Sequence, residues 1–270
     1  MKPVAFDYER APDVAAALKS LAAAGGMARV LAGGQSLGPM LNLRLAQPQL
    51  LVDVRGIAEL RQAVATPEAL VVGACVTHAA IEDGAIPDAT RGFMRSVARD
   101  IGYRAVRNRG TIAGSLCHAD PAGDWVSALL LLDASVCVAG MEGVRVVPAT
   151  SFVTGAYATA LGEAEVVTAI RIPPLSPAAR WSYYKVCRKP GEFAEAIAGF
   201  VVDPERRVCR GVIGATHGAP HAIDDATELL RRFETALALE HVRAAGLDGD
   251  VYEHHVHVSA LKRAAARLKA

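Results

Sequence analysis

Apolar residues occur along this chain in short runs that are bounded by glycine, proline and charged residues. Runs rich in valine, leucine and isoleucine with these boundaries predict β-strands. In the first part of the chain the predicted strands are residues 4–6, 29–32, 50–54, 60–64, 70–72, 135–139, 144–147 and 166–172. Thr66-Pro67-Glu68 separates one pair of these strands and residues 140–143 separate another, which predicts two hairpins.

Helical spacing of apolar residues marks several segments between the strands. Val14, Leu18 and Leu21 place apolar side chains on one face of a helix over residues 13–24, and a Gly-Gly pair follows it. Further helices are predicted over residues 77–83, 88–98 and 125–132. The last of these is almost entirely apolar, so we expect it to be buried.

A proline cluster at residues 173–177 divides the chain. Mostly helical sequence begins near residue 221, and the strands predicted between the two are 181–186, 196–202 and 207–215. Because hairpins and helices alternate irregularly before the cluster, we expect an α+β fold rather than a regular βαβ array. The predicted domains are residues 1–177 and 178–270.

Composition and charge narrow the function classes. The chain has 270 residues, 52% of them hydrophobic, which is enough to bury a core. Lysine and arginine (29) nearly equal aspartate and glutamate (28), so the basic excess typical of nucleic-acid binding is missing. The longest apolar run, residues 126–138, is too short and too polar to span a membrane. With no signal-peptide pattern at the N-terminus, we expect a cytoplasmic protein.

The five cysteines, at positions 75, 117, 137, 187 and 209, contain no C-x-x-C pair. This spacing argues against an iron–sulfur cluster or a structural zinc site held by this chain, and we expect no metal ion on it. An odd number of cysteines without a pattern is also typical of a reducing compartment.

Residues 32–36, Ala-Gly-Gly-Gln-Ser, follow a predicted strand and form the first candidate binding loop. Two adjacent glycines allow a turn with positive φ, so several backbone N–H groups can point at one anion beside the Ser36 hydroxyl. A pyrophosphate suits such a loop, although Gly-Gly after a strand is more often an ordinary turn.

Three better-known motifs are set aside. Residues 34–38 match the G-x-S-x-G nucleophile elbow, but one strand and one helix before them are too little to build the sheet that an elbow requires. The glycine spacing also differs from the Rossmann G-x-G-x-x-G pattern with Asp53 as the ribose acid, and Pro39 constrains the helix start. A P-loop would need a G-K-[ST] ending, which is missing.

Residues 107–124 form a second glycine segment. Thr111, Gly114 and Ser115 repeat the small and hydroxylated residues of the first loop, and Arg107 and Arg109 add positive charge. The two segments could therefore close on the same diphosphate. Asp124, at the end of the segment, could accept hydrogen bonds from sugar hydroxyls, or it could be the N-cap of the predicted helix that follows.

At this point the sequence resembles a family, the FAD-binding medium subunits of molybdenum hydroxylases, which include xanthine dehydrogenase and aerobic carbon monoxide dehydrogenase. The resemblance rests on residues 32–36, 107–115, 119–121 and 124, and extends to 41–45, 51–53, 72–74 and 184–189. It implies a two-lobed FAD-binding domain of the vanillyl-alcohol oxidase type. A small domain of three strands and helices would follow, of the carbon monoxide dehydrogenase flavoprotein C-terminal type.

The resemblance also implies the cofactor-binding residues. These would be Ala32, Gly33, Gly34, Gln35, Ser36, Ile101, Thr111, Ala113, Gly114, Ser115, Asp124, Leu161, Lys185 and Phe193. The two glycine segments would bind the FAD pyrophosphate, and Asp124 a hydroxyl of the sugar chain. Ile101, Leu161 and Lys185 would contact the isoalloxazine ring, and Phe193 would guard its face. Ala113 departs from the family, which usually has glycine there.

The implied activity is electron transfer by an oxidoreductase subunit. A large partner subunit would hold the molybdenum cofactor and a small one two [2Fe–2S] clusters, in a dimer of heterotrimers. FAD on this chain would receive electrons from the clusters and pass them to an external acceptor, with no catalytic residue acting on the organic substrate. Two alternatives remain open: a stand-alone flavin-dependent oxidoreductase with its own substrate, and a binding module that has lost FAD.

Overall fold

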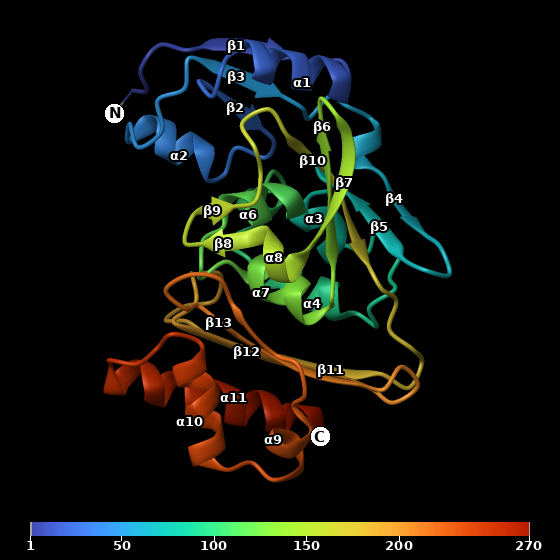
Figure 1. The fold of residues 1–270 in the computed structure, drawn as a ribbon, viewed down its shortest axis with the longest axis vertical. Coiled ribbons are helices and arrows are strands. Elements are labelled where there is room, and N and C mark those ends of the chain that lie inside the picture. The colour runs from blue at the N-terminus through green and yellow to red at the C-terminus, as the bar shows by residue number, and fades with distance from the viewer. Residues whose placement is uncertain (1, 270) are drawn as a thin grey trace.

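The first part of the chain forms a three-stranded parallel sheet, the uppermost part of the computed structural model in Figure 1, which describes residues 2–269. Its elements are β1 (Asp7–Arg10), α1 (Val14–Ala23), β2 (Ala28–Leu31), α2 (Leu37–Asn42) and β3 (Leu50–Asp53), with strand order β1-β3-β2. The side chain of Asp13 caps α1 by accepting a 2.7 Å hydrogen bond from the Ala16 N–H.

The predicted first strand at residues 4–6 is wrong, because the strand is the polar segment that follows. All four residues of β1 are exposed, and they pair with β3 at the sheet edge, from Asp7 opposite Leu50 to Arg10 opposite Asp53. A solvated edge strand needs no apolar side chains, so the hydrophobic pattern does not mark it.

An antiparallel sheet of five strands lies beside and below the first sheet (Figure 1). Its order is β4 (Ala63–Ala65), β5 (Leu70–Gly73), β10 (Val166–Ile172), β6 (Ser135–Gly140) and β7 (Gly143–Pro148). Both predicted hairpins are confirmed as β4–β5 and β6–β7. The first starts later than predicted, since Leu60 lies in a 3₁₀ turn, η1 (Glu59–Arg61), where its side chain is buried.

Short helices fill the middle of the molecule (Figure 1). They are α3 (His78–Glu82), α4 (Phe93–Arg99), α5 (Arg104–Arg107), α6 (Ile112–His118), α7 (Asp124–Leu131) and α8 (Ala149–Phe152), followed by a small hairpin of β8 (Val153–Gly155) and β9 (Ala158–Thr159). Helix α7 is buried along its whole length, as its apolar sequence predicts. Helix α4 begins later than predicted, directly after Gly92, whose φ of +80° lies outside the helical region.

The last part of the chain is a second antiparallel sheet covered by helices. Its strands are β11 (Arg180–Val186), β12 (Ala196–Asp203), β13 (Val208–Gly214) and β14 (His221–Ile223), and its helices are α9 (Thr227–Arg231), α10 (Thr235–Ala244) and α11 (Val251–Lys269). One face of the sheet packs on α7 and the other on α11. The prediction of three strands is wrong by one, because β14 is too short to show an alternating pattern.

Close packing of α7 on this sheet depends on glycine. A Cβ at Gly199 would lie 2.7 Å from Leu131 Cδ2, and one at Gly214 would overlap the Ser127 side chain. The sheet therefore has two cores, one shared with α7 and the other with the C-terminal helices. The predicted domain boundary at residue 177 falls in the connection between β10 and β11.

Parallel and antiparallel sheets occupy separate parts of the molecule, so the fold is of the mixed α and β kind that the sequence predicts. Within residues 2–269, no helix has both the length and the apolar character needed to cross a bilayer.

Candidate cofactor-binding site

The two glycine segments meet in space. The first is the loop between β2 and α2, and the second runs from the end of α5 into α6. A Cβ on Gly33 would overlap the carbonyl oxygen of Arg109 and lie 2.7 Å from Gly110 Cα, so only glycine permits this backbone contact. The two segments also meet at Gly114, where an added Cβ would be in ordinary contact with Ala32 Cβ at 3.8 Å. The sequence prediction that both segments belong to one site is consistent with this contact.

The first loop presents unused hydrogen-bond donors. Within residues 2–269, the N–H groups of Gly34, Gln35 and Ser36 have no hydrogen-bond acceptor. Gly34 has a φ of +71°, and the Ser36 side chain, although at the N-cap of α2, makes no capping hydrogen bond. A row of free backbone N–H groups beside a free hydroxyl is the arrangement that binds phosphate oxygens.

The second segment is fixed from behind by α3 and α7. The His78 N–H donates to the Gly110 carbonyl at 2.9 Å, and the Ile112 N–H donates to Val76 at 3.0 Å. The indole N–H of Trp125 donates to Nδ1 of His78 at 3.0 Å, which requires a neutral imidazole with its proton on Nε2. Burial, with a contribution from the Arg107 charge, lowers the pKa of His78 to about 4.

Thr111 and Gly114 form a hydrogen bond at the start of α6. The Thr111 hydroxyl caps α6 and accepts the Gly114 N–H at 3.2 Å, while Ser115 lies half-buried in the same first turn. Ala113, where the family usually has glycine, is helical, and its methyl group is 3% exposed within the hydrophobic core. The extra methyl therefore occupies the core and leaves the surface of the loop unchanged.

A buried ion pair lies at the start of α7. Lys185 Nζ, on β11, is 2.8 Å from Asp124 Oδ2, and both side chains are less than a tenth exposed. The Tyr183 hydroxyl donates to Asp124 Oδ1 at 3.4 Å, and Lys185 also donates to the Asp100 carbonyl at 3.1 Å. Burial raises the pKa of Asp124 to about 6, although Lys185 opposes the shift. The alternative role of Asp124 as an N-cap is wrong, since Gly123 holds that position.

Ile101 lies in a turn next to this ion pair, and its backbone forms a bridge with Gly191 from the loop after β11. A Cβ on Gly191 would lie 2.6 Å from the Gly102 carbonyl oxygen, so this contact also depends on glycine. Arg107 does not face the diphosphate loops as free positive charge. Its guanidinium pairs with Glu82 at 2.7 Å and donates to the carbonyls of Ile101 and Gly102.

Two predicted site residues lie apart from these clusters. Leu161 is half-buried against the main core after β9, and Phe193 is 65% exposed on the loop between β11 and β12. None of the measured contacts of the described residues joins either one to the glycine segments or to Asp124. The sequence did not indicate that four residues support the site, namely His78, Trp125, Tyr183 and Glu82. The only available signal was the position of His78 directly after Thr77, which caps a helix.

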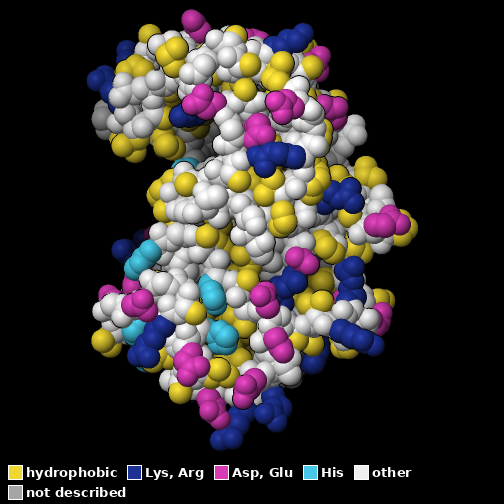
Figure 2. Space-filling view, viewed as in Figure 1, with side chains coloured by type: hydrophobic (Ala, Val, Ile, Leu, Met, Phe, Trp, Pro, Cys, Tyr) yellow, Lys and Arg dark blue, Asp and Glu magenta, His cyan; other side chains and the backbone are white. Residues whose placement is uncertain are grey.

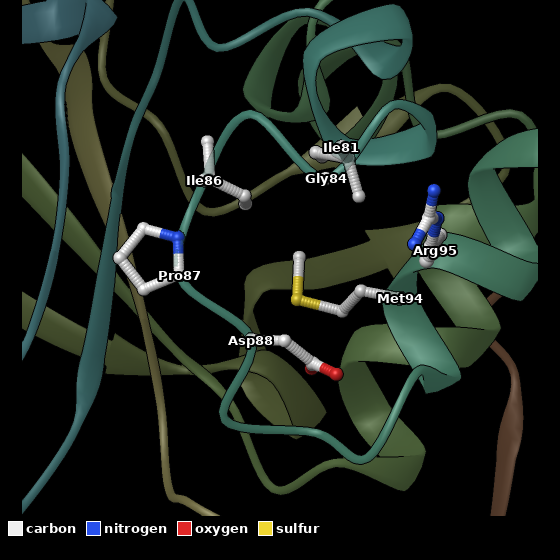
Figure 3. Close-up of a pocket in the computed structure, with 7 residues that line it drawn as sticks. All are labelled: Ile81, Gly84, Ile86, Pro87, Asp88, Met94 and Arg95. Atoms are coloured by element: carbon white, nitrogen blue, oxygen red, sulfur yellow. The ribbon is translucent and has the colours of Figure 1, made fainter.

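Two cavities among the described residues lie away from this site. One of about 170 Å³ lies between α3 and α4 (Figure 3), and another of about 230 Å³ lies between the C-terminal sheet and α9. Neither is lined by a predicted site residue. Figure 2 instead shows a recess at the side of the molecule between its uppermost and middle parts, the two parts that the glycine segments join.

The fold and the two joined loops define a protein that binds a diphosphate-containing cofactor. The family described as the FAD binding domain in molybdopterin dehydrogenase matches residues 4–175, and the chain belongs to this family of oxidoreductase components. The matched residues contain both glycine segments, and the family binds FAD, so the diphosphate-containing cofactor is FAD.

Proteins of similar sequence match most of the chain, and a solved structure matches all of it. The chain is 34% identical to the carbon monoxide dehydrogenase medium chain of Hydrogenophaga pseudoflava, over 91% of this chain and 86% of that one. It is 36% identical to the caffeine dehydrogenase subunit beta of a Pseudomonas species, over 77% and 70%. A solved structure of reconstituted CO dehydrogenase from Oligotropha carboxidovorans superimposes with a TM-score of 0.90 at 31% identity, covering 100% of this chain and 99% of that one.

Proposed function

We propose that this chain is the FAD-carrying electron-transfer subunit of a molybdenum hydroxylase. The observation that carries the proposal is the meeting of the two glycine segments, with three unused N–H groups in the first of them. When bound, FAD supplies a redox group that takes electrons from iron–sulfur clusters and gives them to an external acceptor.

At the diphosphate end, binding falls to Ala32–Ser36 and to the first turn of α6. The N–H groups of Gly34, Gln35 and Ser36 donate to phosphate oxygens, and the Ser36 hydroxyl adds a fourth donor. Thr111, Ala113, Gly114 and Ser115 form the opposite wall, where the absence of large side chains lets the cofactor approach the backbone. The fit is supported by Gly33, whose lack of a side chain lets the walls touch.

At the ring end, Asp124 would accept a hydrogen bond from a hydroxyl group of the sugar chain, and Lys185 would supply a cation near the isoalloxazine. The pair is close to neutral as a whole, so burying it beside a ring costs less than burying either charge alone. Ile101 and Leu161 provide apolar contact with the ring. Phe193, which is exposed on its loop, would guard the ring face from the solvent side.

The division of labour along the chain follows. Residues 1–177 form an FAD-binding domain of the vanillyl-alcohol oxidase type, and 178–270 form the C-terminal domain, which contributes Lys185 and Phe193. The matched family region ends at residue 175, in support of this boundary. All five cysteines are free thiols. Thiols without a disulfide are typical of a reducing compartment, which supports placing the protein in the cytoplasm.

The partners are inferred from the relatives. Proteins called medium chains of carbon monoxide dehydrogenase match most of this chain. We therefore expect a large molybdenum-cofactor subunit and a small subunit with two [2Fe–2S] clusters, assembled as a dimer of heterotrimers. The Asp124 carboxylate is paired with Lys185, so it is not free to act as a base on an organic substrate.

The test uses the purified chain. It should bind one FAD with a flavin absorption spectrum, ADP should compete with FAD, and no organic substrate should be oxidised without the partners. Steady substrate oxidation by the chain alone would instead support a stand-alone oxidoreductase. Failure to bind either FAD or ADP would support a module that has lost the cofactor.

A further inference from the structure

Three successive backbone carbonyls of the turn at residues 100–102 are held by cations. Lys185 Nζ donates to the Asp100 carbonyl at 3.1 Å. Arg107 Nη1 donates to the carbonyls of Ile101 and Gly102 at 3.1 and 2.8 Å. The N–H groups of Asp100 and Ile101 donate back to Val97 and Ala98 at the end of α4, and Gly102 has a φ of +52°. The carbonyl side of the turn is therefore held by these two side chains.

Arg107 is itself fixed on its far side. Its Nε lies 2.7 Å from Glu82 Oε2, and its Nη2 donates to Oε1 at 3.1 Å, a two-point contact that sets the plane of the guanidinium. The Arg107 and Glu82 side chains are only 12% and 15% exposed. The hydrogen bond from Arg107 keeps the pKa of Glu82 below its usual value, so the carboxylate stays charged near neutral pH.

All donor nitrogens of Arg107 are thus directed at Glu82 and at the turn. A guanidinium has five N–H groups in a fixed fork, and this one is held by four hydrogen bonds to its near surroundings. Its charge is compensated by Glu82. Among the described residues only one of its five N–H groups, on Nη2, has no partner, so it lacks the two-point donor fork and the free charge of a phosphate ligand, although its place in the second glycine segment suggests that role.

We propose that Arg107, held by Glu82, is a positioning residue for the flavin ring, which fixes the turn at residues 100–102 and takes no part in binding the diphosphate. The inference rests on the proposed function, because it takes Ile101 to lie against the isoalloxazine. The turn also carries the bridge to Gly191, so Arg107 orients the start of the loop that bears Phe193.

The test separates the two halves of the cofactor. In the Arg107→Met variant of the full chain, the dissociation constant for ADP should stay within about twofold of the wild type. The dissociation constant for FAD should rise by about tenfold, because binding must then order a turn that Arg107 no longer holds, at a free-energy cost comparable to one charged hydrogen bond. The visible circular dichroism and the midpoint potential of the remaining bound flavin should change, since both report on the surroundings of the ring.

Arg104→Met is the matched control. It removes the same charge from the same helix, where Arg104 pairs with Asp83 and with Glu82, and it should leave FAD and ADP binding and the flavin spectrum unaltered. If Arg107→Met folds poorly, Glu82→Gln is the second variant, because it keeps the arginine and removes the carboxylate charge that pairs with it. It should change the flavin circular dichroism in the same direction and leave ADP affinity intact.

A loss of ADP affinity in Arg107→Met equal to its loss of FAD affinity would overturn the inference in favour of a phosphate ligand. Unchanged FAD affinity and flavin spectrum in that variant would overturn it as well. Failure of the proposed function is distinguishable, because the wild-type chain would then bind neither FAD nor ADP.

Discussion

The contact between the two glycine segments can be tested at Gly33. In Gly33→Ala the new methyl group would overlap the Arg109 carbonyl oxygen and lie 2.7 Å from Gly110 Cα. Both neighbours are backbone atoms, and the second segment is tied to α3 through Gly110 and Ile112, so neither can turn aside as a side chain would. The loops must separate by about 1 Å to restore ordinary van der Waals contact.

The cost follows from that separation. Inserting one methylene or methyl group into a close-packed contact typically costs about 1–3 kcal/mol. For a chain of this size that corresponds to a decrease in Tm of roughly 2–6 °C. Because the N–H groups of the first loop move away from the opposite wall, FAD affinity should fall at least tenfold, and the purified variant should lose most of its cofactor.

Gly38→Ala is the control for the substitution itself. Gly38 lies in α2, a few residues along the same loop, and a Cβ there would have nothing within 4 Å. Replacing a helical glycine with alanine should stabilise the chain by about 0.5–1 kcal/mol and leave FAD content unchanged. Thermal unfolding and the ratio of flavin to protein absorbance measure both effects. A Gly33→Ala protein with wild-type Tm and full FAD content would refute the loop contact.

Three further predictions concern buried polar groups of the cofactor-free chain. His78 has a pKa near 4 when folded and about 6.5 when unfolded, so the free energy of unfolding should fall as the pH drops from 6.5 to 4. In urea unfolding of His78→Gln, this loss of stability at acidic pH should be smaller by up to about 3 kcal/mol. Lys185→Met should cost about 3–5 kcal/mol at pH 8, and the cost should shrink below pH 6 as the unpaired Asp124 carboxyl is protonated, whereas an equal cost at both values would count against the ion pair. Ser127→Ala should change the free energy of unfolding by less than about 0.5 kcal/mol, because the buried Ser127 hydroxyl has no hydrogen-bond partner within residues 2–269; a loss above 1 kcal/mol would reveal one.

The sequence predicted those elements whose apolar pattern is strong. Helices α1 and α7 and most strands of the four- and five-stranded antiparallel sheets have a buried face that imposes a periodicity, and their predicted positions agree with the structure to within a few residues. Strands β1 and β14 were missed for different reasons. The first exposes every side chain, and the second is three residues long, so neither has a pattern to detect.

The candidate site was predictable only in its local part. The glycines at 33, 34 and 114 indicate that the backbone is tightly packed or turned there, and this requirement is visible in one segment at a time. What each charged residue does depends on partners that are distant in sequence. Arg107 meets Glu82 across 25 residues and Lys185 meets Asp124 across 61, and no spacing rule connects such pairs. The sequence position of Arg107 alone therefore suggests a phosphate ligand, and only its contact with Glu82 shows another role.

The site draws one wall from each part of the fold, and this has an energetic consequence. The first glycine loop comes from the parallel sheet, the second from the helices in the middle, and Lys185 from the C-terminal sheet. A cofactor that touches all three walls binds only when the parts are docked, so its binding free energy adds to the stability of their docking. The pairs between walls, Gly33 with Gly110 and Asp124 with Lys185, hold the same arrangement in the chain without cofactor. The buried ion pair is therefore explained better as an alignment device for the ring end than as a source of net stability, since desolvation cancels much of its Coulombic gain.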